Sequence, residues 1–164
     1  MVNKNVNFLV GIIMGSQSDW EVMKEAKGQL DEFSILNEQL IISAHRTPNR
    51  ILDYATKSLE NGVKVIIAGA GGAAHLPGMM ASHTQIPVIG VPIESTSLNG
   101  IDSLLSIVQM PKGIPVATVS IGKTGAKNAA ILAAEILSLQ DEQIRNKLLS
   151  WRKSMTNNVP YKPE

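Results

Sequence analysis

Short runs of apolar residues alternate along this chain with longer segments in which apolar positions recur every three or four residues. Val, Ile and Ala dominate the runs, and glycine or small polar residues follow most of them. Runs of this length and composition are typical of strands buried on both faces of a parallel sheet. The pattern predicts five strands, at residues 8–14, 39–43, 63–68, 88–91 and 116–119.

The segments between these runs are predicted to be helices. Ser18 and Asp19 offer an N-cap to the first helix, and Pro48 stands in the first turn of the second. The predicted helices span residues 20–33 and 48–61, a short stretch ending near residue 84, and residues 126–139 and 141–155.

Strands that alternate with helices predict an α/β fold with a mainly parallel sheet covered on both faces. We expect the first strand in the middle of that sheet. The chain has 164 residues and no repeat or linker, so residues 1–164 are predicted to form a single domain. The polar loop 94–100 is expected to be the most mobile segment, and the polar tail 156–164 to lie along a surface.

Composition narrows the function classes. Charged residues make up 18% of the chain and aromatic residues 4%, while hydrophobic residues make up 44%. So much small apolar surface suggests contacts between subunits. The net charge of +1 provides no basic field for nucleic acid, and the absence of cysteine excludes disulfides and thiolate chemistry.

The sequence also bears on location. Its first seven residues are polar and lack the layout of a signal peptide, and no apolar run is long enough to span a membrane. We therefore expect a cytoplasmic protein without a membrane partner.

Three consecutive predicted strands end in distinctive loops. These loops are Gly15–Asp19 (GSQSD), Ser43–Pro48 (SAHRTP) and Gly69–His75 (GAGGAAH). In a parallel sheet of this type, ligands bind beyond the carboxyl ends of the strands. The loops are therefore expected to converge on one crevice.

The first two loops carry polar side chains suited to a phosphorylated ligand. Hydroxyls and free amides at a helix start favour anions, and Asp19 suits a ribose hydroxyl better than a phosphate. His45 suits proton transfer near neutral pH, and the adjacent Arg46 can bind phosphate or carboxylate. Taken alone, the first loop could also be an ordinary helix cap formed by its serines and aspartate. The second loop could carry a capping or structural histidine beside a surface arginine.

The third loop superficially matches the G-x-G-x-x-A form of a dinucleotide fingerprint, at Gly69, Gly71 and Ala74. It follows the third strand rather than the first, and no acidic residue follows at the usual interval. We interpret the glycines as allowing close approach between the ligand and the backbone.

In this order, the loops resemble the class I PurE family, N5-carboxyaminoimidazole ribonucleotide mutase. The matching segments are GSQSDW at 15–20, SAHRTP at 43–48, AGAGGAAHLPGM at 68–79, GVP at 90–92 and DSLLSIVQMPKGIPVATV at 102–119. The likeness continues to WRK at Trp151 and covers nearly the whole chain.

The resemblance implies a flavodoxin-like three-layer α/β/α sandwich and a homo-octamer, with the C-terminal helix and tail at a subunit interface. It implies an enzyme of purine biosynthesis that interconverts N5-carboxyaminoimidazole ribonucleotide and 4-carboxy-5-aminoimidazole ribonucleotide. No metal, nucleotide or biotin cofactor is implied, and the partner is a small ribonucleotide.

By match to the family motifs, His45 is the expected acid and base. Ser16 and Arg46 are expected at the phosphate and Asp19 at the ribose, while the role of His75, near the moving carboxylate, stays open. The remaining residues expected to line the substrate site are Ser18, Ser43, Ala44, Ala70, Gly71 and Leu76.

Three alternatives remain at this point. Some family members add carbon dioxide to aminoimidazole ribonucleotide and typically carry Lys-Gly where this chain has Arg46 and Thr47. Outside the enzymes, the chain could be a nucleotide-binding flavodoxin-like module or a purely structural oligomer.

Overall fold

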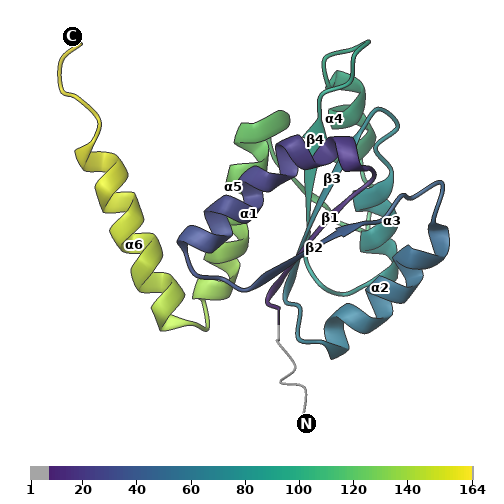
Figure 1. Cartoon of the computed structure of the whole chain (residues 1–164), viewed down its shortest axis with the longest axis horizontal. Helices are drawn as coiled ribbons and strands as arrows, with labels where there is room; N and C mark the ends of the chain where they lie inside the picture. Colours follow the sequence, from purple (N-terminus) through teal and green to yellow (C-terminus); the bar gives the residue numbers. More distant parts are fainter. Residues whose placement is uncertain (1–7, 164) are drawn as a thin grey trace.

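A parallel sheet lies between two layers of helices in the computed structural model, which describes residues 8–163 (Figure 1). All pairings between neighbouring strands are parallel, in the order β2-β1-β3-β4-β5. The strands are β1 (Val10–Met14), β2 (Asn37–Ile41), β3 (Val65–Gly71), β4 (Val88–Ile93) and β5 (Ala117–Thr118). The predicted flavodoxin-like α/β fold is confirmed, with β1 inside the sheet.

Helices connect the strands and cover both faces. They are α1 (Trp20–Glu32), α2 (Pro48–Glu60), α3 (Leu76–His83), α4 (Ile101–Val108), α5 (Gly122–Ser138) and α6 (Glu142–Asn157), with a short 3-10 helix, η1 (Gln17–Asp19), before α1. Within residues 8–163, no helix combines the length and the apolar character needed to cross a bilayer.

Successive side chains of the central strands enter two separate cores, as the alternation of a strand requires. Ile12 and Ile67 pack toward α1, α5 and α6, whereas Ile13 and Ile66 pack toward α2 and α3. All four are fully buried. The sheet is therefore apolar on both faces, which explains why its strands read as continuous apolar runs.

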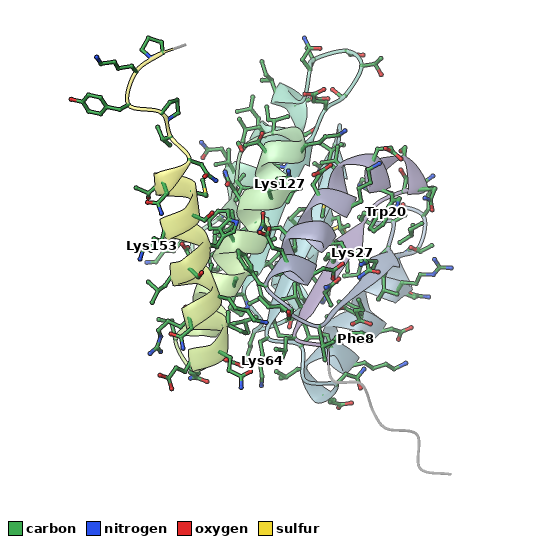
Figure 2. All side chains as sticks on the ribbon, turned by 60° about the vertical axis from the view of Figure 1, so that its left-hand side comes forward. Phe8, Trp20, Lys27, Lys64, Lys127 and Lys153 are labelled. Atoms are coloured by element: carbon green, nitrogen blue, oxygen red, sulfur yellow. The ribbon has the colours of Figure 1, made fainter. Side chains whose placement is uncertain are left out.

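Small residues bring α5 close to the sheet and to α1. Its buried face is made of alanines and two glycines, and a Cβ on Gly125 would lie only 1.6 Å from the carbonyl oxygen of Ser120. Figure 2 shows α6 running alongside α5. Trp151 of α6 meets Phe33, at the end of α1, edge to face. The chain beyond α6 extends away from the body, and Val159 and Tyr161 are exposed (Figure 1).

Most strand ends differ from the prediction by one to three residues, and two of these differences have a physical reason. β2 starts at Asn37 rather than at residue 39, because Asn37 pairs with Val10 and an edge strand tolerates polar residues. β3 continues through Gly71, so the predicted glycine turn is partly strand. Only glycine fits at position 69 of β3, because the Met23 sulfur occupies the space that a Cβ would need.

The helices also differ from the prediction in two places. α5 begins at Gly122, four residues before the predicted start, and Gly122 adopts a positive φ of 76° that suits glycine. The sequence pattern predicts no helix over 101–108, where α4 lies. α4 buries Ser103 and Ile107 and leaves Ile101, Leu105 and Val108 exposed, so its pattern departs from that of an ordinary surface helix.

Candidate active site

A cavity of about 510 Å³ opens at the carboxyl ends of β1, β2, β3 and β4. This is where the chain switches from building the sheet on one side of β1 to building it on the other. The three loops that the sequence singled out all line the cavity.

The first loop is closed on itself by Asp19. Its carboxylate accepts a hydrogen bond of 2.9 Å from the Ser16 backbone N–H, and the hydroxyls of Ser16 and Ser18 lie 2.5 Å apart. Burial raises the pKa of the Asp19 carboxyl, and the Ser16 N–H and the Arg46 charge only partly oppose this effect. The loop therefore presents two hydroxyls and one desolvated carboxyl to the cavity.

The second loop is a turn pinned by Thr47. Its hydroxyl accepts from the Ser43 N–H at 2.9 Å and donates to the Ser43 carbonyl at 3.0 Å. His45 stands at the exposed tip of this turn. Since Thr47 satisfies both backbone groups of Ser43, the turn can hold its shape without support from the sheet.

Arg46 ties the first two loops together. Its Nε donates to the Ser43 hydroxyl at 2.9 Å, and its Nη2 donates to the Gly15 carbonyl at 3.0 Å. A guanidinium has five N–H groups, so donors remain for an anion in the cavity. The positive charge is thus held in place before any ligand arrives.

His45 and His75 meet across the cavity from different loops. His45 Nε2 and His75 Nδ1 lie 2.8 Å apart, and the two rings are edge to face with centroids 5.0 Å apart. One nitrogen must donate and the other accept, so the pair holds one proton between these atoms. The two imidazoles form a unit that can give and take a proton.

The third loop provides the small-residue wall of the cavity. Ala70, Gly71, Gly72 and Ala73 line it between β3 and His75. Gly72 adopts a positive φ of 66°, which favours glycine and turns the chain from the strand toward α3. Within residues 8–163, no three His, Asp or Glu side chains gather as ligands for a metal ion.

The structure places every predicted site residue on this one cavity. Those residues are Ser16, Ser18, Asp19, Ser43, Ala44, His45, Arg46, Ala70, Gly71, His75 and Leu76. Their proximity is a structural fact, while their contacts with a substrate stay a prediction.

Two lining residues were missed as site residues. Glu94 and Ser95 follow β4 directly and line the cavity, whereas the sequence predicts them only as part of a mobile loop. The rule that located the other loops, carboxyl ends of parallel strands, applies to β4 as well. Ser95 is held in place by a 2.7 Å hydrogen bond to Asp102 on α4.

Comparisons with known proteins fit this geometry. Residues 9–158 match the family described as AIRC, AIR carboxylase. The chain is 61% identical over 151 residues to the N5-carboxyaminoimidazole ribonucleotide mutase of Bacillus subtilis (strain 168), covering 92% of this chain and 93% of that protein. It is 50% identical over 164 residues to the enzyme of the same name from Escherichia coli (strain K12), covering 100% and 97%.

Solved structures agree in fold. Treponema denticola PurE superposes with a TM-score of 0.82 at 32% identity, over 90% of this chain and 91% of that one. The structure of a variant of Treponema denticola PurE2 gives a TM-score of 0.84 at 31% identity, over 93% of each chain.

Proposed function

Because this chain belongs to the AIR carboxylase family, we propose that it is a mutase that interconverts N5-carboxyaminoimidazole ribonucleotide and 4-carboxy-5-aminoimidazole ribonucleotide, with His45 as acid and base. The enzyme is an isomerase of purine biosynthesis. The observation that carries the role of His45 is its place beside His75, in a cavity that also contains a fixed guanidinium and a small-residue wall.

The reaction moves one carboxylate and one proton. His45 protonates the exocyclic nitrogen as its bond to the carboxylate breaks and carbon dioxide is released. The electron-rich ring carbon attacks the carbon dioxide, and His45 then removes the proton from that carbon. The proton given in the first step is recovered in the last, so a single acid and base closes the cycle.

His75 orients the imidazole that performs these transfers. Its Nδ1 lies at hydrogen-bond distance from His45 Nε2, although His45 stands at an exposed loop tip with few packing contacts of its own. A histidine held in one orientation and tautomer is a better proton carrier than a free rotor. His75 thereby gains the role that the sequence left open.

The polar loops bind the parts of the substrate that do not react. Arg46 and Ser16 take the phosphate, and the Asp19 carboxyl takes a ribose hydroxyl. Binding energy gathered there positions the ring against His45. Ala70, Gly71 and Ala73 form the wall beside the ring, where small side chains and backbone N–H groups can retain carbon dioxide for recombination.

A coupled assay with two substrates tests this function. One reaction contains N5-carboxyaminoimidazole ribonucleotide with bicarbonate excluded, and the other contains aminoimidazole ribonucleotide with saturating carbon dioxide. The mutase turns over the first rapidly and the second poorly. Turnover that depends on added carbon dioxide would assign the carboxylase reaction instead, and activity with neither substrate would contradict the proposal.

We further propose that the enzyme is a homo-octamer and that it works in the cytoplasm. Exposed apolar residues on α4 and α6, including Leu105 and Leu149, and the extended tail with Val159 support contacts between subunits. The phosphorylated substrate does not cross membranes unaided, which favours the cytoplasm. Sedimentation equilibrium should give eight times the chain mass, and a monomer at all concentrations would contradict the octamer.

A further inference from the structure

One buried hydroxyl lies behind the loop that carries His75. Ser103, on α4, is fully buried. It lies close to this loop in the fold, although it comes 28 residues after His75 in the chain. Its Oγ accepts a 2.9 Å hydrogen bond from the Gly72 N–H and donates a 2.6 Å hydrogen bond to the Ile93 carbonyl. Both of its partners lie at the end of the sheet.

These two bonds continue the sheet by one step. The β3–β4 pairing ends where Gly71 faces Ile93, and Gly72 is the next residue of β3's chain. The Ser103 hydroxyl joins the next N–H of one strand to the last carbonyl of the other. Its two hydrogen bonds are therefore the last connection between the chain after β3 and the end of β4 before the chain turns at Gly72 toward Ala73 and His75.

α4 holds the same region at two further points. The Ser106 hydroxyl donates to the Asp102 carbonyl in α4 at 2.7 Å and lies 3.3 Å from the Gly72 carbonyl, and the Asp102 carboxylate accepts the 2.7 Å hydrogen bond from Ser95. One polar side of α4 thus contacts two of the loops that line the cavity, and α4 packs against β4 (Figure 1). The helix has few other inward side chains, since only Ser103 and Ile107 are fully buried.

We propose that Ser103 is a positioning residue for the reaction: it fixes the Gly72 turn and, through it, His75 and the small-residue wall beside the substrate ring. Ser103 does not line the cavity, so it does not touch the substrate itself. This inference rests on the proposed roles of His45 and His75.

Removing the Ser103 hydroxyl should lower the rate because the Gly72 turn would lose its hydrogen bonds. Without the hydroxyl, the buried Ile93 carbonyl and the Gly72 N–H both lose a partner. The turn would shift to find new ones, and His75 would move with it. Displacements of about 1 Å at a reacting centre can cost up to about 100-fold in rate.

The first test compares two serine-to-alanine variants with equal burial. Ser58 is also fully buried, but its hydroxyl donates to Ala55 within α2, and it does not line the cavity. We expect Ser103→Ala to lower kcat about tenfold with less than about a twofold change in KM, and Ser58→Ala to change neither. Equal kinetics for the two variants would overturn the proposal.

The second test asks whether Ser103 acts through His75. In a double-mutant cycle, Ser103→Ala should lower kcat much less in a His75→Ala background than in the native chain. Additive losses would overturn the proposal. If His75→Ala alone kept full kcat, the role proposed for His75 would be wrong, a result distinct from failure of Ser103→Ala alone.

A third variant covers the case in which Ser103→Ala does not fold. Ser103→Cys changes the volume of the buried side chain little and replaces the hydroxyl by an S–H group that donates and accepts only weakly, so it should fold. We expect its kcat to fall several-fold with little change in KM. An unchanged kcat for folded Ser103→Cys would overturn the proposal.

Discussion

The cavity edge of the sheet and the layer formed by α1 and α5 are built on opposite principles. At the cavity edge, side-chain hydrogen bonds fix the loops, as Arg46 and Thr47 do for Ser43. In the α1–α5 layer, small residues such as Ala129 and Ala133 bring backbones together and leave no room for change. The first region is held by directional bonds between polar groups, and the second by close packing.

This difference predicts how mutations divide. Changes at exposed positions of the cavity edge, such as His45 and Arg46, should lower activity while leaving the fold nearly as stable. Changes in the α1–α5 layer should lower stability while each folded molecule keeps its activity. Four substitutions test the division.

The largest effect is expected for His45→Asn. Loss of the proton carrier should lower kcat about 1,000-fold. The free energy of unfolding should change by less than about 0.5 kcal/mol, since His45 is exposed. Single-turnover kinetics and urea unfolding measure the two quantities. A variant that kept near-native turnover would disprove the assigned role.

Gly125→Ala tests the other region. The new Cβ would collide with the Ser120 carbonyl oxygen, so the start of α5 must shift. We expect the free energy of unfolding to fall by about 3 kcal/mol, with native kcat in the folded fraction. Gly28→Ala is the matched control: Gly28 lies in α1 with open space around it, and alanine should stabilise the helix by about 0.5–1 kcal/mol.

Asp19→Asn should separate activity from stability in one residue. Losing the charged acceptor for the ribose should raise KM about tenfold. Burial raises the pKa of Asp19 in the folded state, so the carboxylate form opposes folding at neutral pH. The variant should therefore be more stable than the native chain at pH 7.

The pH dependence of that gain provides a check on its sign. Below the ordinary pKa of an aspartate, both folded and unfolded chains carry the protonated carboxyl, and the advantage of asparagine should disappear. The advantage should grow as the pH rises from that value to the raised pKa of the folded state, and then level off. Urea unfolding at about pH 4, 5.5 and 7 measures this trend, and an advantage that increased toward acid would contradict it.

The smallest effect is expected for Lys127→Ala. Lys127 Nζ lies 3.3 Å from a Glu25 carboxylate oxygen, and the pair joins α5 to α1 at the surface. Exposed pairs contribute little, so stability should fall by less than about 0.5 kcal/mol, and less still in high salt. A loss above about 1 kcal/mol would mean that polar contacts matter in this layer too.

The sequence was sufficient to predict the sheet and the loops that gather at its edge. Each loop directly follows an apolar run, and parallel strands bring their carboxyl ends together, so the convergence of Ser16, His45 and His75 followed from order alone. That their side chains bind substrate remains a prediction.

Two features could not be predicted because they depend on distant parts of the chain. The His45–His75 hydrogen bond joins residues 30 apart, and only the packed sheet sets the distance between their loops. α4 escaped notice because one of its two fully buried positions is a serine, while Ile101, Leu105 and Val108 are exposed, so its apolar residues do not follow the usual amphipathic pattern. A helix whose polar side serves a neighbouring loop has no simple signature in a single sequence.

The two edges of the sheet have a consequence for solubility. An open edge presents free N–H and carbonyl groups to which a strand of another molecule can add, and long apolar edges promote aggregation. Here one edge, β5, contains only two residues, and the other, β2, begins with the polar sequence Asn37-Glu38-Gln39. Neither offers a long apolar template. The sheet can therefore be continuous and apolar inside while its two edges offer little for a strand of another molecule to pair with.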